Sequence, residues 1–179
     1  MTQEEIAERL ESKINLPEIR DIVNWAHACS ANLESLLEMT RSADTRTSAN
    51  ALWCLTHIQK ENTDRLQSRQ DNFINMLLAE QHVGKRRMLL QLLREQDYDP
   101  ENIRTDFLDY CLTKINSECE PYAIRAFSIY CAFKMCRFYP ELVTELKQHL
   151  DMLELQPLSP GLRSALNTTR KNISRLRSN

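Results

Sequence analysis

Residues 120–140 constrain the fold more than any other stretch, because they predict a helix that is apolar on nearly every side. Pro121 suits the first turn of a helix, where its missing N–H costs nothing. Pro140 stops the helix and keeps Tyr139 out of the helical conformation. The stretch is too short and carries too many cations to span a membrane. We therefore expect a buried central helix that is covered by other helices on both flanks.

The composition favours an all-α protein. The 179 residues include two glycines and six prolines, which are too few for the many turns of a β protein. Charged residues make up 27% of the chain and the net charge is −2, which excludes a disordered or a broadly basic protein. Because apolar residues recur at helical spacing along the chain, we expect about ten helices and no strands.

Signals for helix starts support this division. Thr2 and Glu5 form a capping-box pattern, and Pro17 suits the first turn of the following helix. Further starts are expected at Ser42 or Asp44, at Asn62 or Thr63 before one long helix, at Asp99-Pro100, and at Ser159-Pro160.

The N-terminal residues and the cysteines both bear on the compartment in which the protein resides. The first residues are acidic and include no apolar run, so no signal peptide is expected. The six cysteines include no C-x-x-C pair, which argues against a zinc module, and most of them lie among apolar residues. We therefore expect reduced core thiols, a cytoplasmic protein, and no metal or cofactor.

Comparison of the chain with itself indicates a repeat. The second helix of each expected pair begins with a cation followed by small or apolar residues, and these cations lie about 40 residues apart at Arg46, Arg87, Arg125 and Arg163. The first helices repeat a pattern of apolar residues as well. Because a two-helix unit cannot bury its apolar face alone, such units stack into a solenoid.

The period and the arginine near the start of each second helix resemble HEAT-like repeats. Tetratricopeptide arrays fit less well, since their period is shorter and their Gly/Ala signature is missing. A helical bundle that imitates the period is the other alternative. The resemblance implies a right-handed α–α superhelix of antiparallel helix pairs. It implies about four pairs in residues 31–179 and an N-terminal helical cap in residues 1–30, with residues 1–179 as a single domain.

Charge differs between the two kinds of helix. The second helices are positive, whereas the first helices and the linkers are mostly negative. In HEAT-like solenoids the second helices usually line the concave side, so the resemblance implies a basic concave face that attracts anionic partners. The residues expected on this face are Arg46, Trp53, Lys85, Arg86, Arg87, Arg125, Arg163, Arg170 and Lys171.

Several of these cations also have a structural interpretation. Arginines at repeat starts commonly contact a neighbouring acid or carbonyl, and this applies to Arg46, Arg125 and Arg163. Within residues 85–87 we expect one cation to be structural and the others to be free for a partner.

No motif in the chain names a reaction. P-loop, G-x-G-x-x-G, H-E-x-x-H and G-x-S-x-G patterns are absent, and the four histidines are scattered. Some DNA glycosylases that excise alkylpurines are built from HEAT-like repeats and place tryptophans and a carboxylate on concave helices. Here Trp53 is followed one turn later by His57 instead of an acid. A glycosylase-like enzyme is therefore a distant third hypothesis.

The sequence favours a non-enzymatic HEAT-like scaffold that binds an acidic protein or peptide on a basic concave face. The alternative is binding of a DNA or RNA backbone by the same face. Aromatic residues for base stacking are few there, since Phe127 and Tyr130 resemble core residues and leave only Trp53. No membrane partner is expected, and the oligomeric state is left open.

Overall fold

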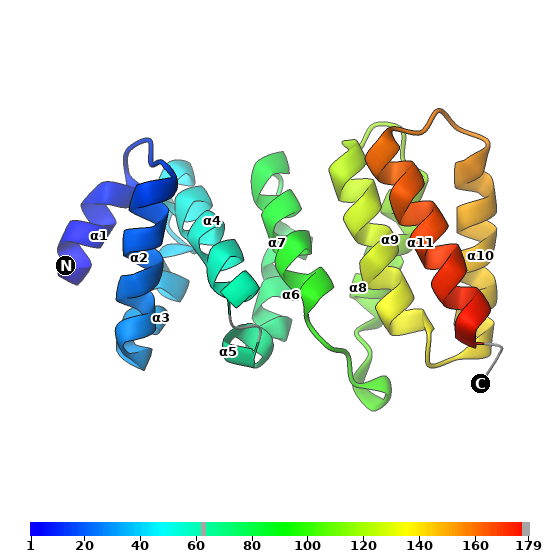
Figure 1. Cartoon of the computed structure of the whole chain (residues 1–179), viewed down its shortest axis with the longest axis horizontal. Helices are drawn as coiled ribbons and strands as arrows, with labels where there is room; N and C mark the ends of the chain where they lie inside the picture. The colour runs from blue at the N-terminus through cyan, green and yellow to red at the C-terminus, as the bar shows by residue number, and fades with distance from the viewer. Residues whose placement is uncertain (62–63, 177–179) are drawn as a thin grey trace.

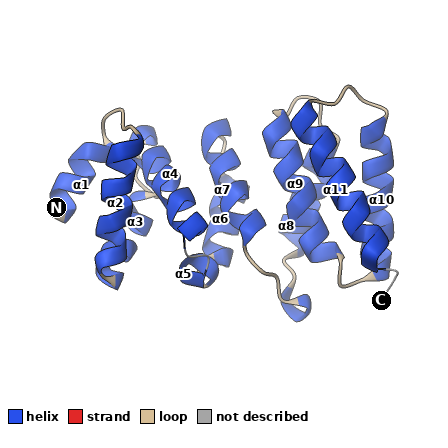
Figure 2. Ribbon diagram, in the orientation of Figure 1, coloured by secondary structure: helices blue, strands red, loops and turns tan. Residues whose placement is uncertain are grey.

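The computed structural model describes the backbone of residues 1–61 and 64–176 and the side chains of residues 1–58 and 65–176. Within these ranges the chain forms eleven α-helices and one short 3-10 helix, with no strand (Figure 2). The helices are α1 (Gln3–Leu10), α2 (Leu16–Ala28), α3 (Ser30–Met39), α4 (Thr45–Glu61), α5 (Asp64–Gln67), α6 (Gln70–Ala79), α7 (Val83–Glu95), η1 (Pro100–Asn102), α8 (Thr105–Ile115), α9 (Tyr122–Cys136), α10 (Pro140–Glu154) and α11 (Pro160–Leu176).

The helices stack in chain order into a solenoid whose two ends carry the two termini (Figure 1). Helices α2, α4, α7, α9 and α11 pack successively on one another and form one layer, which we call the second-helix layer. Behind it, α3, α6, α8 and α10 each pack on the second helix that follows them in the chain. The pairs α3–α4, α6–α7, α8–α9 and α10–α11 confirm the expected all-α solenoid.

Helix α9 is the central helix that residues 120–140 predict. Pro121 is its N-cap residue, and Pro140 opens the next helix. The helix packs against α7, α8, α10 and α11, so it is covered on both flanks. Nine of its residues are buried, and only one of these, Arg125, is charged.

Local capping explains several of the helix starts. The side chain of Thr2 accepts a hydrogen bond from the backbone N–H of Glu5, and the Glu5 carboxylate accepts one from the N–H of Thr2, as the capping box predicts. Asp44 caps α4 by accepting a bond of 2.7 Å from the N–H of Thr47. A second capping box, which was not expected from the sequence, joins Asn15 and Glu18.

Two expected boundaries are wrong. The long helix expected after residue 61 is divided into α5 and α6 by a turn at residues 68 and 69, and its expected start at Asn62 or Thr63 lies outside the described residues. Asp99-Pro100 opens a 3-10 turn instead of α8. The extended backbone of Ile103 and Arg104 then breaks the chain, and α8 begins only at Thr105.

One continuous cluster of buried apolar residues runs from Ile6 to Ile173. The division into a cap at 1–30 and a single domain over 1–179 stays a prediction. All six cysteines are free thiols. Cys54, Cys111, Cys131 and Cys136 are buried, whereas Cys29 and Cys119 are exposed. Burial raises the pKa of Cys54 and of Cys136 to about 12. No helix in the described ranges combines the length and the apolar character that a membrane crossing requires.

Candidate interaction surface

The second-helix layer is nearly free of acids over its last four helices. Helices α4, α7, α9 and α11 all carry cations, and their only acids are Glu61, whose side chain is not described, and Glu95. The acids that face these cations belong to the loops and the first helices. The layer therefore has the charge bias that the sequence predicts, but the eight cations that were expected on the basic face fall into two groups.

Lys85 and Arg86 belong to the first group, whose members are engaged inside the solenoid. The Nζ of Lys85 lies 2.6 Å from a carboxylate oxygen of Glu80 and 3.3 Å from the hydroxyl of Ser48. Arg86 donates from Nη1 to Glu120 over 2.8 Å, and Lys114 lies 2.7 Å from the same carboxylate oxygen. Both cations are therefore held by acids in the loops that flank α7 and α9.

Glu120 is ionised by this arrangement. Burial alone would raise the pKa of its carboxyl group, but hydrogen bonds from Arg86 and Lys114 outweigh burial, and the net shift is downward. The same balance holds for Glu80, where burial is outweighed by the hydrogen bond from Lys85 and by backbone donors.

Arg125 is the most deeply embedded cation of the set, with 2% of its surface exposed. Its Nε donates to the carbonyl oxygen of Ile115 over 3.0 Å, and its Nη2 donates to the side-chain oxygen of Gln156. Arg170 is also engaged: its Nη2 lies 2.8 Å from both Asp151 and Glu154 of α10.

The second group consists of exposed cations, namely Arg46, Arg87, Arg163 and Lys171. None of them forms an ion pair with another described residue. The internal role considered for repeat-start arginines therefore holds for Arg125, whereas Arg46 and Arg163 face solvent. Within residues 85–87, two cations are engaged and one, Arg87, is free, which reverses the expected proportion.

Aromatic residues lie partly exposed on the same layer. Trp53 of α4 is half-buried, and its ring lies 6.4 Å from that of His57. The guanidinium carbon of Arg94 lies 5.2 Å from the ring centre of Phe127 and 5.1 Å from that of Tyr130. Such distances are those of cation–π contacts, so Arg94 joins α7 to α9 through two rings.

Arg94 is not among the residues predicted for the basic face, and Phe127 and Tyr130 were expected in the core. The structure leaves both rings only half-buried. A signal was present, because Arg94 follows Arg87 by two helical turns and so shares its helix face. Arginine, tyrosine and tryptophan are also the residues that contribute most to binding at protein interfaces.

The surface offers little to catalysis among the described residues. No group of three His, Cys, Asp or Glu side chains there is placed to hold a metal ion. Trp53 has His57 as its ring neighbour on α4, and no carboxylate follows it at that position. The nine residues expected on the basic face thus include four exposed cations, four engaged cations and one half-buried tryptophan.

Comparison with known proteins agrees with this architecture. The model of a family described as HEAT repeat domain matches residues 6–174. A search of curated proteins found no match, and a search of solved structures found none either. The matched segment extends from α1 to α11 and includes every helix pair of the solenoid. The chain belongs to the HEAT repeat family.

Proposed function

We propose that this protein is a non-enzymatic scaffold that binds an acidic protein segment on its second-helix layer. HEAT repeats generally serve as scaffolds for protein interactions, and the family is generally non-enzymatic. The proposal assigns the initial attraction to Arg46, Arg87, Arg163 and Lys171. It assigns the contact itself to Arg94 with its two rings and to Trp53. A cytoplasmic location, favoured by the free thiols, belongs to the same proposal.

The proposal rests on one observation: the second-helix layer has exposed cations without ion-pair partners and almost no acids. Four exposed cations have no ion-pair partner among the described residues, and Glu95 is the only acid of α7, α9 and α11. A surface of one sign attracts a partner of opposite sign and raises the association rate. The acidic partner would supply the carboxylates that the layer itself lacks.

Arg94 is the point of close contact in this proposal, because its two ring contacts hold its guanidinium in place. Its Nε lies 2.6 Å from a carboxylate oxygen of Glu95, which leaves the two terminal nitrogens without a described partner. The rings of Phe127 and Tyr130 fix the plane of the guanidinium. A guanidinium fixed in this way can accept a carboxylate with little further loss of conformational freedom.

The test is binding of a fluorescein-labelled oligoglutamate peptide, followed by fluorescence anisotropy at low salt. Arg87→Glu reverses a free charge on the layer and should weaken binding about fivefold. Lys13→Glu makes the same change in charge at an exposed site in the loop between α1 and α2, and should leave the affinity within about twofold. Both variants should keep the wild-type circular dichroism spectrum. Equal affinities for the two variants would contradict the proposal.

Reversal of all three cations at residues 85–87 would be a poorer test than Arg87→Glu alone. Lys85 and Arg86 are engaged by Glu80 and Glu120, so a glutamate in place of either would set two carboxylates against each other. The triple variant would lose stability as well as binding, and the two effects could not be separated.

Nucleic-acid backbone binding is the second candidate, and α11 favours it. This helix carries Arg163, Lys171 and Arg175 as exposed cations and contains no acid. If Arg46, Arg87, Arg163 and Lys171 each neutralise one phosphate, the logarithm of the affinity for duplex DNA should fall with the logarithm of the salt concentration with a slope of about −3.6. A glycosylase-like enzyme stays the third candidate and is the least supported.

A further inference from the structure

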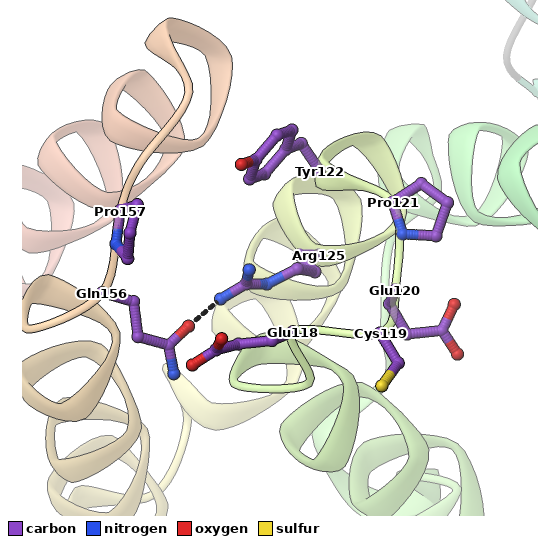
Figure 3. A pocket seen from close by; sticks show the side chains of 8 residues that line it. All are labelled: Glu118, Cys119, Glu120, Pro121, Tyr122, Arg125, Gln156 and Pro157. Atoms are coloured by element: carbon purple, nitrogen blue, oxygen red, sulfur yellow. Dashed lines mark hydrogen bonds between the residues drawn. The ribbon is translucent and has the colours of Figure 1, made fainter.

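The loop edge of the solenoid contains a pocket that the proposed function does not use. It has a volume of about 380 Å³ and is lined by residues of the α8–α9 loop, the start of α9 and the α10–α11 loop. Figure 3 shows Arg125 between these two loops, with Tyr122 on one side of its guanidinium and Glu118 on the other. Because the pocket lies at the loops, it is separate from the Arg94 stack halfway along α9.

Arg125 is a buried cation whose described hydrogen-bond partners are both neutral. Its Nε donates to a backbone carbonyl and its Nη2 to the amide oxygen of Gln156, while Nη1 has no hydrogen-bond partner among the described residues. Lys85, Arg86 and Arg170 of the second-helix layer each reach a carboxylate, whereas the half-buried Lys134 donates to the carbonyl oxygen of Gln96. Arg125 is the more deeply buried of the two described cations of this layer that have only neutral hydrogen-bond partners. A buried guanidinium without a carboxylate is costly, and desolvation lowers the pKa of Arg125.

Neither of the two acids that line the pocket, Glu118 and Glu120, forms an ion pair with Arg125. The carboxylate of Glu120 is bound by Arg86 and Lys114, and Figure 3 shows it directed away from Arg125. Glu118 is exposed and close enough to act on Arg125 electrostatically, but it makes no ion pair with it. Tyr122 is 50% exposed, and with Pro121 and Pro157 it gives the pocket an apolar rim.

We propose that this pocket is a binding site for a single carboxylate of a peptide, which would pair with Nη1 of Arg125 between Tyr122 and Pro157. An arginine guanidinium prefers a carboxylate or a phosphate as its partner. The negative charge of Glu118 at the rim opposes a doubly charged phosphate more strongly than a singly charged carboxylate. The apolar rim suits the carbon chain that carries a glutamate or chain-terminal carboxylate.

The experiment is a titration of ¹⁵N-labelled full-length protein with acetyl-Gly-Glu-Gly-amide, followed by NMR. Saturable shifts should be confined to the backbone amides of the residues that line the pocket and their neighbours, namely 118–120, 122, 123 and 156, and to the Nε–H of Arg125. Acetyl-Gly-Gln-Gly-amide, which lacks the carboxylate, should give no saturable shift. Inorganic phosphate should bind more weakly than the glutamate peptide.

Arg125 variants are expected to lose stability, so the second test changes an exposed residue at the rim of the pocket instead. Glu118→Gln removes the opposing charge from an exposed side chain and should tighten binding of the glutamate peptide about threefold. Glu101→Gln, an exposed acid of η1, is the matched control and should leave the affinity unchanged.

Three outcomes would overturn the proposal: no saturable shift with the glutamate peptide, equal shifts with the glutamine peptide, or tighter binding of phosphate. The proposal is separate from the proposed function, because Arg87→Glu should weaken binding to the second-helix layer and leave these shifts as they are.

Discussion

Helices α9 and α11 both have an arginine at their fourth position, but the two arginines lie in different surroundings. Arg125 is the fourth residue of α9 and Arg163 is the fourth residue of α11. Arg125 is buried and bound to Gln156 in the loop before α11. Arg163 is exposed and forms no ion pair among the described residues. Sequence position within the repeat is the same, so the difference must come from the neighbouring repeat.

Arg86 supports this explanation. Arg86, and not Arg87 as the repeat in the sequence predicts, is the fourth residue of α7. It reaches Glu120 in the loop before α9, just as Arg125 reaches the loop before α11. A cation at this position therefore links its own repeat to the following one. Helix α11 is the last described helix, so Arg163 has no such loop to reach within the described chain. The comparison shows that one repeat position is a structural link inside the array and a free charge at its described end.

The largest effect is expected where the link is buried. Arg125→Ala removes hydrogen bonds to Ile115 and Gln156 and leaves both acceptors inside the structure. We expect the free energy of unfolding to fall by about 3 kcal/mol. Urea denaturation monitored by circular dichroism measures this change. A loss no larger than that of an exposed arginine would show that the link contributes little.

An intermediate effect is expected at the link from α7, and it depends on pH. The pKa of Glu120 is lowered in the folded protein, so its contribution is fully present above the unfolded-state pKa of about 4.3 and is lost as the pH falls through the folded-state value. Glu120→Gln should therefore reduce stability by about 1–2 kcal/mol at pH 7, and the gap to wild type should close below about pH 4.

Glu101→Gln is the matched control for this measurement, since Glu101 is an exposed acid of η1 that forms no ion pair with another described residue. Its urea midpoint should follow wild type across the pH range. A gap between Glu120→Gln and wild type that does not change with pH would contradict the assignment of the effect to this carboxylate.

The smallest effect is expected at the described end of the array. Arg163→Ala changes the same repeat position as Arg125→Ala but removes no side-chain hydrogen bond or ion pair to another described residue, so the urea midpoint should not change measurably. A clear loss of stability would mean that Arg163 has a structural partner, and the comparison between α9 and α11 would then fail.

Much of the fold follows from the sequence because its signals are local. Pro121 and Pro140 bound the central helix, and Asp44 caps α4, through contacts within one turn of the chain. The division of residues 64–79 into α5 and α6 was missed. Gln67 and Gln70, which lie on either side of the turn, both donate to the carbonyl oxygen of Asp97, about 30 residues away, and no local pattern reports such a contact.

The candidate surface was predictable only in part, for the same reason. The excess of cations on second helices is a property of composition and could be read directly. The sequence does not show which of the three cations at residues 85–87 points outward. That depends on Glu80 and Glu120, which lie in two different loops. The half-exposure of Phe127 and Tyr130 likewise depends on how α7 and α9 pack.

The buried thiols can report when individual repeats of the solenoid open. Cys54 lies in α4, Cys111 in α8, and Cys131 and Cys136 in α9, and all four are shielded from alkylating reagents while the helices stay packed. In a solenoid held by nearest-neighbour contacts, neighbouring repeats can open separately. The order in which these thiols react with an alkylating reagent would then give the order in which the repeats open. Equal alkylation rates at all four thiols would mean that the array opens as one unit.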